Sequence, residues 1–212
     1  MKNSNQLTRF IVMVVIFSAI LLLGFIGKAF SQITINNLTV TEGKGAMTSG
    51  FDVVVSFSSP NGLIYGAQAN NERSNLRFGK TFGNKKVGEF SALATGGAFK
   101  NVPWIGPMFL YQYKWIDLFS WTGIGMATNK NFTDPGWKPT YFFNYEEAGL
   151  TLGKNRFAYS FILFTTEKIN HFAIYRRTFP LNEKSKFFFE TTWHFSKKIP
   201  MFVIGYRHSF SK

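Results

Sequence analysis

The sequence predicts an all-β protein that folds as an antiparallel transmembrane β-barrel of about 12 strands. Three observations lead to this prediction. Short runs rich in Phe, Tyr, Val, Ile and Thr recur along the chain, each bounded by Gly, Asn, Pro or Lys, which is typical of strands and turns. Many runs have about 9–11 residues, the length of a tilted strand that crosses a bilayer. Within several runs, aromatic and apolar residues alternate with small, polar or charged ones.

The composition also differs from that of an ordinary globular domain. The 212 residues include 26 Phe, and aromatic residues reach 18% against 17% for charged residues. Lysine and arginine outnumber aspartate and glutamate by 24 to 11, so the formal net charge is +13. Such a basic excess suits a nucleic acid, an anionic membrane surface or an acidic solute. Cysteine is absent, which excludes disulfides and thiolate metal sites.

The first 31 residues have the features of a signal peptide. A basic segment containing Lys2 and Arg9 precedes the apolar stretch FIVMVVIFSAILLLGFIG, and Ala29 and Ser31 stand at the spacing that signal peptidase reads. The apolar stretch exceeds the usual length of about 7–15 residues, so an uncleaved membrane anchor is the alternative. We expect residues 1–31 to direct export and residues 32–212 to form the barrel domain. An exported chain has little access to nucleic acid, so no nucleic-acid partner is expected.

The first seven predicted strands are ITINNLTVT (33–41), GFDVVVSFS (50–58), LIYGAQAN (63–70), SNLRFGKTF (74–82), GEFSALATGG (88–97), IGPMFLYQY (105–113) and LFSWTGIGMA (118–127). In the second of these, Phe51, Val53, Val55 and Phe57 share one face because side chains two apart point the same way. The first segment has the weakest pattern. If it is only a tail, ten strands are expected instead.

The last five predicted strands are TYFFNYEEAGLTL (140–152), RFAYSFILFTT (156–166), HFAIYRRTF (171–179), KFFFETTWHFS (186–196) and PMFVIGYRHSF (200–210). The links SPNG, KWID and GKN are short, whereas TNKNFTDPGWKP is the longest. In bacterial barrels the last strand runs toward the periplasm, turns there are short, and external loops are long. Counting back from the last strand places the three short links on the periplasmic side and the longest link outside.

The pattern resembles the small outer-membrane β-barrels of Gram-negative bacteria over essentially the whole mature chain. Those proteins typically finish on a strand whose last residue is Phe, whereas here Phe210 is followed by Ser211 and Lys212. The resemblance implies an outer-membrane location and contact with outer-membrane lipid. Aromatic residues near strand ends are expected to form interfacial girdles. These residues are Tyr65, Tyr113, Trp115, Trp121, Trp137, Tyr141, Trp193 and Tyr206.

Charged residues placed within strands, mostly opposite the aromatic rows, predict an ionic lumen. The expected lumen-lining residues are Arg77, Glu146, Arg176, Glu190, His194 and Arg207. In a narrow lumen, opposite charges on neighbouring strands can pair and plug the barrel. In a wider lumen, the basic surplus favours anionic solutes.

We therefore expect a non-enzymatic protein, either structural or a small pore with a preference for small anionic solutes. In size and charge it is similar to the twelve-stranded channels with basic lumens that pass acidic oligosaccharides. One alternative is a membrane-embedded lipid-modifying enzyme, which needs a Ser hydroxyl within reach of a His. His208 and Ser209 cannot make this pair, because adjacent residues in a strand face opposite ways. Another alternative is a soluble periplasmic β-barrel that binds an apolar ligand, with its aromatic rows facing inward.

No cofactor or metal is expected. His171 and His194 have no ligand spacing, and no glycine-rich phosphate loop is present. The segment DPGWKP, with Asp134 and Trp137, is expected to form an external loop. Its first role is a turn, and recognition at its tip is the alternative.

Overall fold

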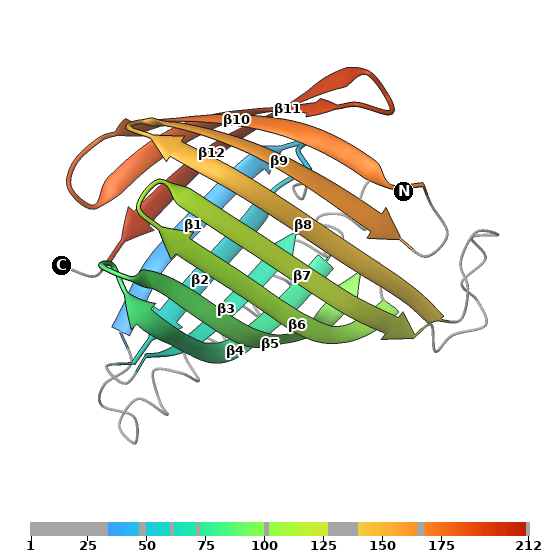
Figure 1. Cartoon of the computed structure of the whole chain (residues 1–212), viewed down its shortest axis with the longest axis horizontal. Coiled ribbons are helices and arrows are strands. Elements are labelled where there is room, and N and C mark those ends of the chain that lie inside the picture. The colour runs from blue at the N-terminus through green and yellow to red at the C-terminus, as the bar shows by residue number, and fades with distance from the viewer. Residues whose placement is uncertain are drawn as a thin grey trace, which may run out of the picture.

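A computed structural model describes residues 34–46, 50–59, 62–70, 73–99, 102–126, 140–164 and 168–210 of the chain. Within these ranges twelve antiparallel strands close into one barrel (Figure 1). Each strand pairs with its neighbours along the chain, and the first strand pairs with the last. Closure removes the free sheet edges that would otherwise pair with other chains. The predicted fold class is confirmed.

All twelve predicted runs are strands. They are β1 (Thr34–Gly43), β2 (Asp52–Ser58), β3 (Leu63–Asn70), β4 (Arg73–Asn84), β5 (Gly88–Phe99), β6 (Val102–Tyr113), β7 (Ile116–Met126), β8 (Thr140–Leu152), β9 (Asn155–Phe164), β10 (Asn170–Pro180), β11 (Ser185–His194) and β12 (Ile199–Ser209). The weakest predicted strand, 33–41, corresponds to β1 and closes the barrel against β12. The ten-strand alternative is therefore wrong. No helix in the described ranges is long and apolar enough to cross a bilayer.

The two ends of the barrel differ in their connections. The links at 59–62, 85–87, 114–115, 153–154 and 181–184 lie at one end, which we call the short-turn end. At this end β1 begins and β12 ends, and the hairpins β6–β7 and β8–β9 are visible at the left of Figure 1. The longest separation between consecutive strands, 127–139, belongs to the opposite end. The three short links predicted to share one side do share it.

Most of the described outer face is apolar and exposed, as the alternation predicted, whereas Val55 and Phe57 on the outer face of β2 are buried. On β12, Phe202 and Ile204 are 50% and 58% exposed, whereas Met201 and Val203 between and beside them are 6% and 2% exposed. Outward aromatics also stack across neighbouring strands, as Phe189 and Phe202 do at 5.9 Å between ring centroids. The aromatic rows therefore face the surroundings rather than a closed core, which is the arrangement of a protein surrounded by lipid.

The lumen face is not uniformly small and polar, because it also carries large aromatic rings. Trp104, Trp121 and Phe143 on β6, β7 and β8 pack edge to face inside the barrel, with ring centroids 5.1–5.3 Å apart. Glycine makes room for such rings, because a Cβ on Gly123 would collide with the ring of Phe143. Large and small residues thus alternate around this part of the lumen.

Candidate functional site

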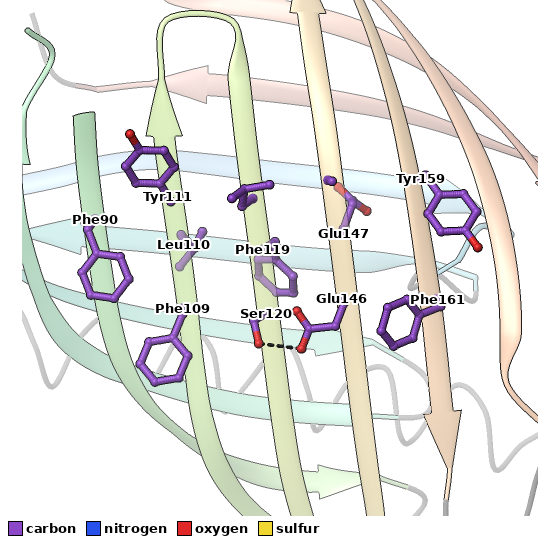
Figure 2. Close-up of a pocket in the computed structure, with 12 residues that line it drawn as sticks. Phe90, Phe109, Leu110, Tyr111, Phe119, Ser120, Glu146, Glu147, Tyr159 and Phe161 are labelled. Atoms are coloured by element: carbon purple, nitrogen blue, oxygen red, sulfur yellow. Dashed lines mark hydrogen bonds between the residues drawn. The ribbon is translucent and has the colours of Figure 1, made fainter. Parts of the chain in front are cut away.

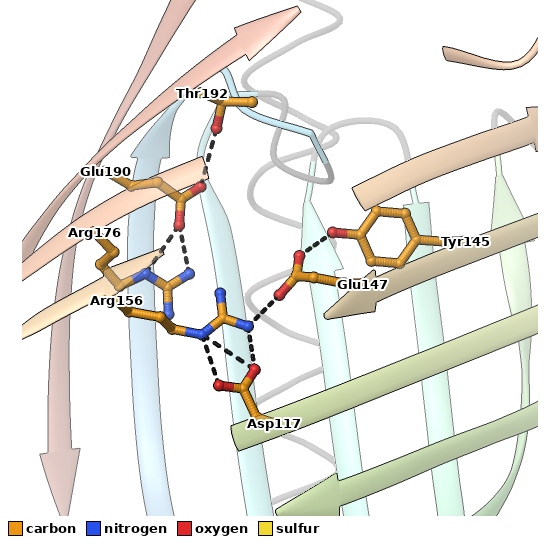
Figure 3. A network of polar contacts seen from close by, with 7 residues as sticks. All are labelled: Asp117, Tyr145, Glu147, Arg156, Arg176, Glu190 and Thr192. Carbon is orange, nitrogen blue, oxygen red and sulfur yellow. Dashed lines mark hydrogen bonds and ion pairs between the residues drawn. The ribbon is translucent and has the colours of Figure 1, made fainter. Parts of the chain in front are cut away.

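An ionic network lines the lumen on β7, β8 and β9 (Figure 3). The Arg156 guanidinium on β9 donates to Asp117 Oδ1 and Oδ2 on β7, with Nε–O distances of 3.1 and 3.2 Å. It also donates through Nη2 to Glu147 Oε1 on β8 at 2.5 Å. The Tyr145 hydroxyl donates to the second oxygen of Glu147. Arg156 therefore holds two carboxylates from two other strands.

Gly149 creates the space in which this network forms. It is the cross-strand partner of Asp117 on one side and of Ala158 on the other. A Cβ at Gly149 would lie 2.5 Å from Arg156 Nη2 and 2.6 Å from Asp117 Oδ2. A larger side chain here would have to move the ends of Arg156 and Asp117, so glycine allows the close approach of this ion pair.

A second ion pair joins β10 and β11. Arg176 and Glu190 are cross-strand partners, and Arg176 donates to Glu190 Oε2 from Nε at 2.9 Å and from Nη2 at 2.5 Å. The Glu190 side chain is buried, and the Arg176 guanidinium lies 4.6 Å from the ring centroid of Phe188. Arg176 is also the cross-strand partner of Arg156, so the two arginines meet between flanking carboxylates.

A polar chain crosses β2, β3 and β4 on the lumen side. The Gln68 amide donates to Asp52 Oδ2 at 2.7 Å, and the Asn75 amide donates to Gln68 Oε1 at 3.0 Å. Arg77 Nε donates in turn to Asn75 Oδ1 at 3.0 Å. Arg73 adds a charge to the same carboxylate, with 3.7 Å between its Nη2 and Asp52 Oδ2.

Two cations face each other near the short-turn end of the lumen. Lys186 on β11 and Arg207 on β12 are cross-strand partners. Arg207 Nε donates to the buried Thr39 Oγ1 on β1 at 3.0 Å, and Lys186 is exposed. The four ion pairs of the described residues involve Arg73, Arg156 (twice) and Arg176, and neither Lys186 nor Arg207 takes part. This pair adds positive charge that the described lumen carboxylates do not pair with.

Five of the six predicted lumen residues lie on the lumen face: Arg77, Arg176, Glu190, His194 and Arg207. His194 is buried against the ring of Phe172, and its Nδ1 accepts a hydrogen bond from the backbone of Lys197 in the β11–β12 turn. Its role there is structural.

Glu146 is the exception and is a correction to the prediction. It points to the outer face, where its Oε1 accepts a hydrogen bond from Ser120 at 2.7 Å. The next residue, Glu147, is the lumen carboxylate of β8. The reason is the alternation of a strand, which sends two sequential glutamates to opposite faces. The sequence analysis did not identify the lumen residues Asp117, Glu147, Arg156 and Lys186. Lys186 could have been found, because it lies four residues before Glu190 on the same predicted strand and therefore faces the same way.

Glu146 lies in an outward-facing cleft of about 400 Å³ (Figure 2). Phe90 and Phe109, stacked at 6.0 Å, border the cleft on one side, and Tyr159 and Phe161 border it on the other. The lining of the cleft is mostly apolar, and Ser120 and Glu146 form a hydrogen-bonded polar pair within it. It belongs to the wall that faces away from the lumen.

The predicted aromatic girdle is present in part. Tyr65, Tyr113 and Tyr206 face outward toward the short-turn end, Trp115 is exposed in the β6–β7 turn, and Trp193 is exposed near the opposite end. Trp121 is a correction: it faces the lumen, is 3% exposed, and donates from Nε1 to Thr95 Oγ1 at 3.0 Å. The backbone of Tyr141 belongs to β8, but its side chain lies outside the described residues, as do Trp137 and Asp134.

A Ser and His pair occurs on the outer face, between strands rather than within one. Ser185 Oγ on β11 lies 2.9 Å from His208 Nδ1 on β12, and the Tyr206 hydroxyl donates to Ser185 Oγ at 3.1 Å. The Ser185 side chain is buried, and its backbone N–H donates to Asn182 Oδ1 at 2.7 Å. Sequence reasoning excluded His208 with Ser209 correctly, but it could not see this cross-strand neighbour. No three His, Asp or Glu side chains in the described ranges come together as a metal site.

Comparison with known proteins finds similarity in structure alone. No protein-family model matches the chain, and no curated protein matches it. The solved structure of the KdgM porin matches with a TM-score of 0.54 at 8% identity, covering 84% of this chain and 100% of that one. A NanC porin structure matches with a TM-score of 0.54 at 7% identity, with the same coverage. A KdgM porin in complex with disordered oligogalacturonate matches with a TM-score of 0.53 at 8% identity, again over 84% and 100%. The chain therefore has the fold of small porins, and the resemblance to outer-membrane barrels is confirmed at the level of fold.

Proposed function

We propose that this protein is an outer-membrane pore that passes small anionic solutes. The fold is that of porins, and the exposed aromatic rows on the outer face suit contact with lipid. The outward direction of these rows argues against the soluble alternative, in which they would pack inward. The observation that carries the anionic preference is the cationic couple of Lys186 and Arg207 in the lumen, which takes no part in the ion pairs of the described residues.

The described lumen charges of β7 to β12 fall into two groups with different roles. Arg156 and Arg176 are neutralised by Asp117, Glu147 and Glu190, so they tie the strands of the wall together. Lys186 and Arg207 are near Arg176 but outside these pairs, so their charge acts on whatever enters the lumen. Charged side chains lining a pore set its ion selectivity, and a surplus of Lys and Arg favours anions.

Carboxylate-bearing sugars are the first solutes to test. One KdgM porin structure holds oligogalacturonate, whose units each carry one carboxylate. A guanidinium binds a carboxylate through two parallel hydrogen bonds, whereas an ammonium acts as a point charge. Arg207 would supply the guanidinium and Lys186 the ammonium, and the two lie opposite each other in the lumen.

The test is the reversal potential of the purified protein in planar bilayers under a KCl gradient. We expect anion selectivity in the native protein and its loss in Lys186→Gln/Arg207→Gln. Lys197→Gln/Lys198→Gln in the β11–β12 turn is the matched control and should keep it. Unchanged selectivity in the lumen variant would overturn the assignment of these residues, and absence of conductance would leave a structural barrel.

A lipid-modifying enzyme is the second candidate, because Ser185 and His208 have the required contact. The pore is preferred for two reasons. Ser185 is 6% exposed, and its backbone N–H is already bonded to Asn182, so it offers no oxyanion donor. A fluorophosphonate probe that labelled the native protein, but not Ser185→Ala, would reverse this preference.

A further inference from the structure

Lysines occur in turns at both ends of the barrel, and most turns of the short-turn end carry them. Four of its links carry them: Lys85 and Lys86 in 85–87, Lys114 in 114–115, Lys154 in 153–154 and Lys184 in 181–184. All five side chains are exposed. Glu183 is the one carboxylate in the described residues of these turns. This end of the barrel therefore carries a strong local excess of positive charge.

Two more cations extend this excess onto the outer wall. Lys80 on β4 and Arg177 on β10 face outward within the last few residues of their strands. Lys80 Nζ lies 5.7 Å from the ring centroid of Phe82, and the Arg177 guanidinium lies 5.6 Å from that of Phe179. Lys114 is placed in the same way, 5.0 Å from the ring of Tyr113. These three cations are thus held beside aromatic rings.

The position of these cations beside aromatic rings indicates which kind of molecule they contact. Aromatic rings at the ends of membrane strands lie at the depth of lipid headgroups. Cations beside them are at headgroup depth and face sideways, toward neighbouring lipids, rather than off the end of the barrel. A phosphate of an anionic phospholipid is the group that a lateral, shallow array of Lys and Arg would meet there.

We propose that these seven cations, Lys80, Lys85, Lys86, Lys114, Lys154, Arg177 and Lys184, form a basic rim that enriches anionic phospholipids around the short-turn end. The inference rests on the proposed membrane location but not on conduction through the lumen. In the predicted orientation, the leaflet that meets the rim is the periplasmic one. The attraction is electrostatic at short range, so it weakens as ionic strength rises.

Trp115 reports on this rim directly. It is 50% exposed in the β6–β7 turn, next to Lys114 and one hairpin away from Lys154. Trp104 and Trp121 are buried in the lumen, so lipid quenchers do not reach them. Replacing Trp137 and Trp193 by Phe leaves Trp115 as the lipid-accessible fluorophore. Quenching by dibrominated phosphatidylglycerol is then compared with quenching by dibrominated phosphatidylcholine in proteoliposomes.

We expect phosphatidylglycerol to be preferred about fivefold beside Trp115 at low salt, and the preference to fall at high salt. The rim variant Lys80→Gln/Lys114→Gln/Lys154→Gln/Arg177→Gln removes four of the seven cations and should lose most of the preference for phosphatidylglycerol. The matched control Lys44→Gln/Lys168→Gln/Lys197→Gln/Lys198→Gln removes four cations from the opposite end and should keep the preference.

Equal quenching by both lipids in the native background would overturn the proposal, and so would a preference that is undiminished in the rim variant or disappears in the control. Loss of lipid preference together with rim-dependent pelleting on purified peptidoglycan would assign the rim to the cell-wall polymer instead. Quenching of Trp115 by dibrominated phosphatidylcholine shows membrane insertion in every case. Failure of the lipid inference is thereby distinguished from failure of the proposed location, while bilayer selectivity tests the pore separately.

Discussion

Lys186 and Arg207 are direct cross-strand partners in the lumen, so two cations stand opposite each other where β11 meets β12. Like charges in this position oppose strand pairing. At other lumen positions charges of opposite sign meet, as Arg176 and Glu190 do on β10 and β11. A second like-charged pair, Arg156 and Arg176, is flanked by carboxylates. A cationic couple that works against stability is the feature most readily explained by what passes through the barrel.

Lys186→Glu should stabilise the barrel, because it turns a like-charge pair into an ion pair with Arg207. Cross-strand ion pairs contribute roughly 0.2–1 kcal/mol, and removing the repulsion adds a similar amount. The measurement is the urea dependence of folding in detergent or lipid. Lys184→Glu, in the turn two residues earlier, makes the same change of charge without a lumen partner and should have little effect. Equal effects of the two variants would contradict the prediction.

The adjacent glutamates of β8 should respond in opposite ways. Glu147→Leu removes a carboxylate that binds Arg156 and accepts from Tyr145, so we expect a loss of about 1–3 kcal/mol. Glu146→Leu replaces an outward carboxylate by an apolar side chain on the lipid face, so we expect a gain of up to about 1 kcal/mol. Each variant serves as the control for the other. A destabilised Glu146→Leu would show that the outer cleft needs its carboxylate.

Gly149→Val should destabilise the barrel by about 2–4 kcal/mol, because its side chain would occupy the space of Arg156 Nη2 and Asp117 Oδ2. Ala148→Val, one residue away on the outer face, is the matched control and should be nearly neutral. Unfolding midpoints in urea compare the two. If Gly149→Val were as stable as the control, the ion pair would be able to rearrange without cost.

Closure of the barrel depends on β1. Val40 lies between Val53 on β2 and Tyr206 on β12, so Val40→Pro removes a ladder hydrogen bond at the seam. The native protein should migrate differently in SDS with and without boiling, as a closed barrel does. Val40→Pro should lose this shift, whereas Val40→Thr, which keeps strand propensity, should retain it. A heat-dependent shift in Val40→Pro would mean that the barrel closes without β1.

Much of the fold could be predicted because each strand carries its own signal. On β12 the alternation alone separates the two faces. Phe202, Ile204 and Tyr206 lie on the outer face, and Met201, Val203 and Arg207 lie on the lumen face. Residues typical of turns marked where most strands end. The two-residue hairpin loop 114–115 also needs a residue with positive φ. Lys114 indeed has a φ of 52°.

The errors arise where one strand alone holds no decisive signal. Trp121 lies on a strand with Leu118, Ile124 and glycine, so apolar residues occupy both faces and neither is marked as the lumen. Glu146 and Glu147 are chemically identical, so the sequence does not show which one faces the lumen. Their partners in the structure, Ser120 for Glu146 and Arg156 for Glu147, distinguish the two faces. Ser185 and His208 are 23 residues apart and become neighbours through pairing of β11 with β12.

The sequence by itself determined the class of fold, the strands and most of their faces, because alternation and turn chemistry act over a few consecutive residues. The tertiary structure decided which charges meet. Partners such as Asp117 and Arg156, or Lys186 and Arg207, depend on the register between strands and on closure of β1 against β12. Register is a property of two strands at once, and a shift of one residue exchanges lumen and lipid for every side chain.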